Sequence, residues 1–230
     1  PGEGPGDTRR MAGCCDARGC DKVFGPRLAH QLANRYRRRG LDRISRRLVD
    51  WLVGQGIEGA SVLEIGGGVG EIQLELLRRG AARTTNLELS QAYDAEATAL
   101  AAEAGMAGRM TRRLGDIAVE AGVADVHDFV VLNRVVCCYP DVERLVGAAT
   151  RHARRGVVLT HPPRHIGSVA TLAVVNGVQR ILGREYRAFA HPPEVMKAVL
   201  LDQGLVPRHV HKGAFWHVLT GPRTVEGSVS

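Results

Sequence analysis

Aromatic side chains are scarce in this 230-residue sequence, where they make up 4% of the residues. Proteins that bind single-stranded nucleic acid stack successive bases on aromatic rings, so the composition disfavours nucleic acid as a partner. The sequence also lacks an uninterrupted apolar run of about 20 residues, which a transmembrane helix requires. Its most apolar stretch, residues 166–182, is interrupted by Asn176, Gln179 and Arg180. We therefore expect a soluble protein.

The amino-terminal 25 residues are rich in Gly, Pro and charge and have no apolar core, so they do not have the pattern of a secretory signal. This pattern predicts a cytoplasmic location. Met11 is an alternative first residue, which leaves open whether residues 1–10 are native. The five cysteines are odd in number and include two pairs of sequence neighbours, so reduced thiols are expected rather than a disulfide framework.

The excess of positive over negative charge is confined to one part of the chain. The net charge is +7, and residues 1–47 hold 12 Lys and Arg against 5 Asp and Glu, whereas the remainder is balanced. The arginines of residues 35–47 are open to three interpretations: a solvated helix surface, a site for an anionic substrate, or peripheral contact with an acidic membrane surface. RNA has the least support, because no nucleic-acid motif accompanies the charge.

Hydrophobic periodicity divides the chain into a helical part and an alternating part. Helices are predicted at 26–39 and from residue 42 to about 55. Strands and helices then alternate, which is typical of a mainly parallel sheet. The predicted strands are 61–65, 83–87, 109–114, 129–132, 156–160, 205–210 and 214–220, and the predicted helices between them are 70–79, 91–104, 141–152, 165–182 and 193–203.

The expected organisation is a flexible cysteine-containing segment at 1–22, a basic helical cap at 23–56, an α/β domain at 57–222 and a tail at 223–230. The last two strands follow one another without a helix and predict a closing antiparallel hairpin. The fold class is thus α/β, with a mostly parallel seven-stranded sheet. The apolar helix at 165–182 is interpreted as a lid or a wall of the site.

A glycine cluster follows the first strand and begins the next helix, a geometry that lets a ligand approach backbone N–H groups. A dinucleotide fingerprint requires glycines at i, i+2 and i+5, and no register of this loop supplies the third. A phosphate-binding Walker loop is excluded too, because no Gly-Lys-Ser/Thr follows. The pattern present is an acid followed by alternating glycines: Glu64, Gly66, Gly68 and Gly70.

This motif resembles that of class I S-adenosylmethionine-dependent methyltransferases, which have a Rossmann-like fold. The resemblance implies S-adenosylmethionine as the cofactor and implies that Glu64 holds its amino group, directly or through water. It also implies that Glu88, at the end of the second strand, binds the ribose hydroxyls next to Leu89. Asp116 and Ile117, after the third strand, take the parts of adenine ligand and adenine contact.

The acceptor is expected beyond the carboxyl ends of the fourth and fifth strands, where ligands sit in open α/β sheets. The pattern there, with the basic helices, loosely resembles magnesium-protoporphyrin O-methyltransferases, and Asn133 stands where that family leads us to expect an acid. We expect Asn133 beside the cofactor and these residues beside the substrate: Tyr36, Arg134, Cys138 and Arg164. The resemblance favours O-methylation of a small, anionic and partly apolar molecule.

Methyl transfer needs a base only when the acceptor is protonated at the moment of attack. His161, at the end of the fifth strand, is the first candidate for that base, and Tyr139 is the second. The other histidines, including His209 and His217, show no pattern that separates them from surface or core residues. Oligomeric state and acceptor identity are not encoded in any motif.

The cysteines support alternative functions. Folding could bring Cys14, Cys15 and Cys20 to Cys137 and Cys138 and create a thiolate cluster for a metal or metalloid, although paired C-x2-C spacing is lacking. This arrangement would suit S-methylation or metalloid methylation, or a non-catalytic thiol or metal sensor that retains the cofactor pocket. Another use of the sulfonium cofactor is the remaining alternative.

Overall fold

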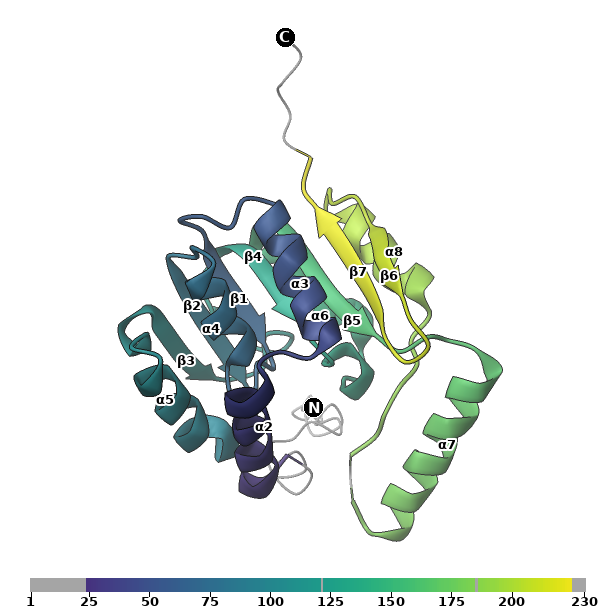
Figure 1. Ribbon diagram of the computed structural model, residues 1–230. Helices are drawn as coiled ribbons and strands as arrows, with labels where there is room; N and C mark the ends of the chain where they lie inside the picture. Colours follow the sequence, from purple (N-terminus) through teal and green to yellow (C-terminus); the bar gives the residue numbers. More distant parts are fainter. Residues whose placement is uncertain (1–23, 121, 185, 225–230) are drawn as a thin grey trace, which may run out of the picture.

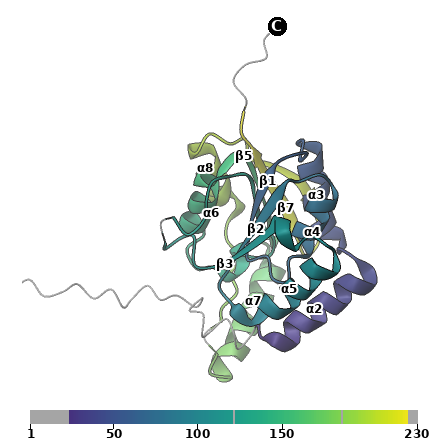
Figure 2. The same ribbon diagram turned by 90° about the vertical axis from the view of Figure 1, so that its left-hand side faces the viewer.

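A computed structural model describes residues 24–120, 122–184 and 186–224. A central sheet is covered by helices on both faces, and one further helix stands apart from these layers (Figures 1 and 2). The predicted segment 1–22 and most of the predicted tail lie outside the described residues, so the structure bears only on the two parts between them.

The sheet has seven strands, as the sequence predicts, and their order is β3-β2-β1-β4-β5-β7-β6. The first five pair in parallel, whereas β7 runs antiparallel to both β5 and β6. The bounds of the strands are β1 Ser61–Ile65, β2 Arg83–Glu88, β3 Met110–Leu114, β4 His127–Leu132, β5 Ala153–His161, β6 Arg208–Lys212 and β7 His217–Pro222. Strand β1 is buried along its whole length, including the polar residues Ser61 and Glu64.

The closing hairpin lies two to three residues later in the sequence than predicted. Pro207 has no N–H to donate to a ladder, so β6 begins only at Arg208. Leu205 instead makes one isolated bridge with Arg223, beyond the end of β7. The turn therefore occupies residues 213–216, which the prediction placed partly in the second strand.

The helices confirm the predicted alternation. Their bounds are α2 Pro26–Arg39, α3 Arg43–Gly54, α4 Glu71–Arg78, α5 Asp94–Glu103, α6 Val142–Arg151, α7 Ile166–Ile181 and α8 Pro193–Asp202. Helix α2 has Pro26 in its first turn and ends at Gly40, whose φ is 64°. The Asp42 carboxylate caps α3 by accepting hydrogen bonds from the N–H groups of Ile44 and Ser45, at 2.9 and 3.0 Å.

Helices α3, α4 and α5 cover one face of the sheet, and α6 and α8 cover the other (Figure 2). Each face has its own apolar core. One contains Leu48, Leu52, Ile72 and Leu76, and the other is built around Leu132, Leu145, Met196 and Leu219. Two buried cores of this size fix the register of the strands and hence the position of every residue at their carboxyl ends.

The two amino-terminal helices have different positions. Helix α3 packs against α4 and β7, within the layer over the sheet. Helix α2 packs against α5, at the end of the sheet where the parallel strands terminate (Figure 1). Of the two helices expected to form a cap, α2 is therefore the one that lies over this edge.

Helix α7 does not form a wall of the site, which is one of the two roles predicted for it. None of its residues is buried, and Ile166 and Ile181 are 91% and 85% exposed. It extends away from the sheet as an arm (Figure 1). Among the described helices none is long and apolar enough to cross a bilayer.

Candidate active site

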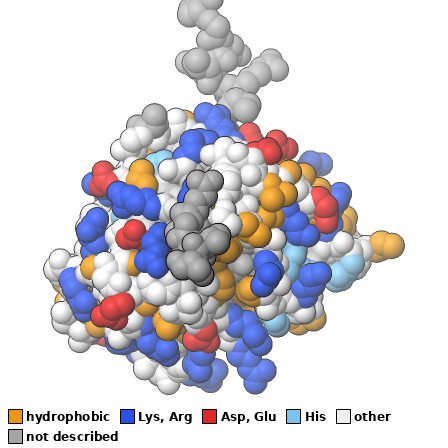
Figure 3. Space-filling view, turned by 90° about the horizontal axis from the view of Figure 1, so that it is seen from above, with side chains coloured by type: hydrophobic (Ala, Val, Ile, Leu, Met, Phe, Trp, Pro, Cys, Tyr) orange, Lys and Arg blue, Asp and Glu red, His pale blue; other side chains and the backbone are white. Residues whose placement is uncertain are grey.

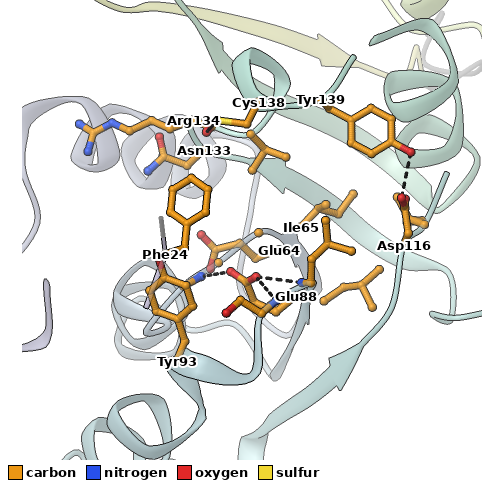
Figure 4. A pocket seen from close by; sticks show the side chains of 18 of the residues that line it. Phe24, Glu64, Ile65, Glu88, Tyr93, Asp116, Asn133, Arg134, Cys138 and Tyr139 are labelled. Carbon is orange, nitrogen blue, oxygen red and sulfur yellow. Dashed lines mark hydrogen bonds between the residues drawn. The ribbon is translucent and has the colours of Figure 1, made fainter. Parts of the chain in front are cut away.

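A cavity of about 300 Å³ opens at the carboxyl ends of β1, β2 and β4 (Figure 4). Residues from the glycine turn, from the ends of these strands and from helix α2 line it. The predicted residues among them are Glu64, Gly66, Gly68, Glu88, Leu89, Asp116, Ile117, Asn133, Arg134, Cys138 and Tyr139. The cavity thus collects nearly the whole predicted site in one place.

The glycine turn has a backbone that residues with side chains could not adopt at low cost. Gly66 and Gly68 have φ of 65° and 52°, and Gly70, the N-cap of α4, has φ of 81°. A Cβ on Gly66 would stand 2.6 Å from a methyl group of Val135. The turn therefore keeps its backbone open to the cavity and brings it close to the loop after β4.

The Glu88 carboxylate is held by backbone N–H groups at the end of β2. One oxygen accepts from Gly68 at 2.8 Å, and the other accepts from Leu89 and Ser90 at 2.9 and 3.4 Å. Arg112 supports this arrangement by donating to the Gly68 carbonyl at 2.8 Å. The carboxylate is therefore fixed in orientation and borders the cavity, with acceptor capacity left on its oxygens.

Three carboxyl groups with raised pKa border the same cavity. Burial is the largest cause for each, and it raises the pKa of Glu64 well above its usual value. Burial also raises the pKa of Glu71 and of Glu88, although nearby arginines oppose the shift in both. Such carboxyls are stabilised in their charged form by a bound cation or by hydrogen-bond donors. The site therefore favours a ligand that carries positive charge and hydroxyl groups.

The far end of the cavity is formed by Asp116 and Tyr139, which face each other in Figure 4. The Tyr139 hydroxyl donates to one carboxylate oxygen of Asp116 at 2.9 Å, and the Ala118 N–H donates to the other at 2.9 Å. Buried Ile117 adds an apolar surface beside them. This end can hold a flat ring that has a polar edge.

The opposite end is organised by the loop after β4. Asn133 donates to Ser45 on α3 and accepts from Thr160 on β5, both at 3.1 Å. Arg134 has φ of 61°, the one positive value among the non-glycine residues of the described chain. Its N–H donates to the Thr160 hydroxyl at 2.7 Å. These bonds hold a strained backbone that places the Arg134 side chain at the cavity.

Two arginines and an apolar helix face border this end. The Arg134 guanidinium lies 2.9 Å from the Asp42 carboxylate, and Arg35 lies 3.7 and 3.8 Å from Asp42 and Glu71. In both arginines the Nε is buried and has no hydrogen-bond partner among the described residues. Leu28 and Leu32 of α2 add apolar surface to the lining at this end. An anionic group attached to an apolar body would satisfy the unpaired donors and cover the leucines.

Comparison with known proteins now decides the family. Residues 63–160 match the family model described as a methyltransferase domain. This part of the chain is a methyltransferase domain of the class I S-adenosylmethionine-dependent type. None of the curated proteins matches the sequence.

Solved structures share the fold of this methyltransferase at low sequence identity. Magnesium protoporphyrin IX methyltransferase from Synechocystis PCC 6803 with bound SAH has a TM-score of 0.66 at 20% identity and covers 92% of this chain and 97% of its own. An O-methyltransferase family protein from Burkholderia thailandensis has a TM-score of 0.67 at 18% identity, covering 90% and 64%. Geranyl diphosphate C-methyltransferase from Streptomyces coelicolor A3(2) has a TM-score of 0.60 at 14%, covering 79% and 80%. These likenesses establish the fold alone.

Neither candidate base presents an unbonded side chain to the cavity. His161 is 1% exposed and is not part of the lining, because its side chain projects toward β6 and β7, where it meets His209. Tyr139 is part of the lining, but its hydroxyl is bonded to Asp116. Among the described residues that line the cavity there is neither a histidine nor a lysine.

Three other predicted residues lie outside the cavity of the methyltransferase. Tyr36 is buried beside α4, where its hydroxyl donates to Glu75 at 2.8 Å. Arg164 borders a shallow hollow at the start of α7. Gly70 faces the opposite side of the turn. All three were predicted to lie at the site from their positions in the sequence. Whether their side chains or backbone face the cavity depends on tertiary packing, which the sequence pattern does not show.

The predicted cysteine cluster is only partly within the described residues. Cys14, Cys15 and Cys20 lie outside them. The sulfurs of Cys137 and Cys138 lie 3.6 Å apart. The hydrogen bond with Cys138 and burial together raise the pKa of Cys137 strongly, which disfavours a thiolate there. Cys138 reaches the cavity and lies 3.3 Å from the Tyr186 hydroxyl.

Sequence reasoning missed the part of the site that α2 and its neighbours supply. The lining residues that were not predicted as site residues are Phe24, Leu28, Leu32, Arg35, Ile65, Gly67, Glu71, Leu87, Ser90, Tyr93, Gly115, Val135 and Leu145. Arg35 was part of the arginine run and was not distinguished from its neighbours. The arginines of residues 35–47 have different roles. Arg35 lines the cavity, whereas Arg37 forms ion pairs with Glu96 and Glu103 on α5, at 3.3 and 2.7 Å. On the face seen in Figure 3, Lys and Arg side chains are likewise scattered among acidic ones.

Proposed function

We propose that this methyltransferase transfers the methyl group of S-adenosylmethionine to a carboxylate oxygen of a small, partly apolar acceptor. The observation that carries the proposal is the pairing of two buried, unpartnered arginine Nε atoms with an apolar helix face at one end of the cavity. Carboxylates accept forked hydrogen bonds from guanidinium groups, which makes arginine suited to hold them.

The cofactor would occupy the other half of the cavity. In this arrangement Asp116 and Ile117 contact the adenine, Glu88 accepts from the ribose hydroxyls, and the amino group lies toward Glu64. The order of these residues along the cavity supports it, because Glu88 and Glu64 lie between the Asp116 end and the Arg134 end in Figure 4. A bound ammonium group would also offset the buried negative charge of Glu64 and Glu71.

The reaction then needs positioning more than acid–base chemistry. A lone pair of the carboxylate oxygen attacks the methyl carbon, the carbon–sulfur bond breaks, and its electron pair stays on sulfur as S-adenosylhomocysteine. No proton moves, so no base is required. This fits a cavity whose described lining contains neither histidine nor lysine. Burial of the site and orientation of the two reactants in line supply the acceleration.

A carboxylate acceptor has more support here than a thiol or metalloid at the cysteines. Cys137 is buried, with a strongly raised thiol pKa, and it does not line the cavity. Of the two cysteines in the described part of the chain, Cys138 borders the acceptor end and Cys137 does not. The neighbour from Synechocystis is named for magnesium protoporphyrin IX, whose carboxylate side chains make it a sensible first acceptor to test.

The test is turnover with a panel of apolar carboxylates, including magnesium protoporphyrin IX, beside matched alcohols and thiols. We expect S-adenosylhomocysteine and a methyl ester to form in equal amounts, with only the carboxylates active. Arg134→Gln should raise KM for the acceptor about 10–100-fold, as expected for the loss of hydrogen bonds to a charged group. Arg47→Gln, on the exposed surface of α3, is the control and should leave KM unchanged.

Methylation of alcohols or thiols at the same rate as carboxylates would refute the acceptor assignment. An equal KM for the Arg134 and Arg47 variants would remove Arg134 from the acceptor site. Cofactor affinity, measured by calorimetry, should be the same in both variants, which separates a lost acceptor contact from a disturbed cofactor site.

A further inference from the structure

Three histidines from three strands meet beside the active site, on the opposite side of β5. They are His161 at the end of β5, His209 in β6 and His217 at the start of β7. Each offers a ring nitrogen, and these nitrogens all lie within 4.8 Å of one another. Among the described residues this is the one group of three or more potential metal-binding side chains so arranged.

Strand pairing explains why the side chains converge. His161 and His217 are direct partners in the antiparallel β5–β7 pair, so both side chains project from the same face of the sheet. His209 pairs with Leu219, two residues beyond His217 and hence on that face too. A register shift between His209 and His211 marks a bulge in β6, and bulges commonly re-aim a side chain.

The hydrogen bonds of His161 fix its proton. Its Nδ1 lies 2.9 Å from the carbonyl oxygen of Pro162, which can only accept, so Nδ1 carries the hydrogen. The Nε2 lone pair therefore points to His209, whose Nε2 is 2.9 Å away. A backbone carbonyl that binds the remote N–H is the usual support for a metal-binding imidazole.

The other two rings are compatible with the same ligand. A hydrogen bond between two Nε2 atoms requires one proton between them, here on His209. A cation could take its place if the His209 proton moves to Nδ1. The Nδ1 of His217 is buried and has no hydrogen-bond partner in the described chain. Such an unsatisfied buried nitrogen is costly, and a bound cation would satisfy it.

The surroundings keep the imidazoles neutral, as ligands must be. Burial lowers the pKa of His161 and of His209 to about 4, and it also lowers that of His217. Nearby cationic groups act in the same direction, and one acid opposes them: these are Lys197 on α8, Lys212 and His211 on β6, His165 before α7, and Glu194 on α8. The lysines also repel a metal ion, so the cluster would bind it less tightly than a site with acidic neighbours.

We propose that His161, His209 and His217 form a binding site for a divalent transition metal, with zinc as the best-suited ion. Zinc accepts three imidazoles and keeps a fourth position open for water or another ligand. Zn–N bonds of about 2.0–2.1 Å place the ligand nitrogens roughly 3.3 Å apart in a tetrahedron, close to the 2.9 Å between His161 and His209. The ion would tie β5, β6 and β7 together.

The proposal does not depend on the methylation reaction. Tag-free protein would be dialysed against zinc alone and its metal content measured, with cobalt as a spectroscopic substitute. We expect one zinc per chain, a rise in Tm on adding zinc, and a cobalt spectrum typical of tetrahedral nitrogen ligation. A chain in which Cys14, Cys15 and Cys20 are changed to Ser should bind equally well, which separates this site from the cysteines.

Single variants test the ligands. His209→Gln and His217→Gln should each weaken zinc binding by more than about 100-fold, since loss of outer partners alone costs about 10–100-fold. His211→Gln, on the same strand but outside the cluster, is the matched control and should bind as the native chain does. Circular dichroism would show whether each variant is folded.

Three results would overturn the site. The first is a native chain that binds no zinc above background. The second is a cobalt complex with the intense near-ultraviolet absorption of thiolate ligands, an outcome that needs no variant. The third is equal zinc affinity in His211→Gln and in a folded His209 or His217 variant.

Discussion

The two halves of the cavity are built in different ways. The half around Glu88 consists of backbone turns and carboxylates at the carboxyl ends of β1, β2 and β3, and the glycine turn donates a hydrogen bond to the Glu88 carboxylate. The half around Arg134 is assembled by side chains from α2, α3, β4 and β5, which are far apart in the sequence. The first half is fixed by the sheet, and the second depends on how α2 and α3 dock against it.

This difference matches what each half has to recognise. A cofactor common to a whole family can be bound by backbone groups and a few acids in fixed positions. An acceptor that differs between relatives is better recognised by side chains on a docked helix, which can change without disturbing the sheet. We therefore expect changes in the first half to affect cofactor binding and stability, and changes in the second to affect acceptor binding.

The largest effect is expected at the glycine turn. Gly66→Ala combines the cost of a positive φ with a Cβ placed 2.6 Å from Val135, so the protein should lose about 2–4 kcal/mol of stability and its affinity for the cofactor. Gly59→Ala is a close control, because Gly59 has a φ of 68° and open space around its Cβ. It should cost only about 1–2 kcal/mol. Chemical denaturation of the two variants measures the difference, and equal losses would contradict the close contact.

A smaller effect is expected from Glu88→Ala. Removal of charged hydrogen bonds to the ribose should weaken cofactor binding by about 1–3 kcal/mol. Titration calorimetry with S-adenosylhomocysteine measures this loss, and Glu58→Ala, an exposed loop substitution, provides the baseline. Unchanged affinity in the Glu88 variant would show that the cofactor lies elsewhere.

The buried carboxyls predict a pH dependence of the unliganded protein. Glu64, Glu71 and Glu88 have pKa values raised mainly by burial, so the folded state binds more protons than the unfolded state above the ordinary carboxyl pKa. Stability contributed by the protonated forms is therefore lost as pH rises through the raised values. Tm measured against pH should fall in that range, and S-adenosylmethionine, through its ammonium group, should reduce the fall. A Tm that stayed level without ligand would contradict it.

The smallest effect is expected at Tyr36, which the sequence placed at the substrate and the structure places beside α4. Tyr36→Phe removes a partly buried hydroxyl bonded to Glu75 and should cost about 1 kcal/mol of stability without changing KM for the acceptor. Steady-state kinetics and thermal denaturation together separate the two roles. An increased KM at unchanged Tm would return Tyr36 to the acceptor site.

The cofactor half could be predicted because its residues are set by strand ends. Glu64 and Glu88 lie near the carboxyl ends of β1 and β2, and Asp116 lies just beyond β3, and parallel strands bring these ends to one edge. The acceptor half could be predicted only in part: Arg134 and Cys138 follow β4 as expected, but the packing of α2 selects Arg35 and not Arg37 from one arginine run. The histidine cluster also escaped prediction, since cross-strand register and a bulge, neither visible in the sequence, bring its members together.

The strand order has a consequence for the sequence of folding events. Strand β6 precedes β7 in the chain, yet β7 lies between β5 and β6 in the sheet. Because β6 pairs with β7 alone, the two strands can form a hairpin first and join the sheet together through β7. Until that hairpin has been synthesised, β5 presents an open edge at which another chain could pair.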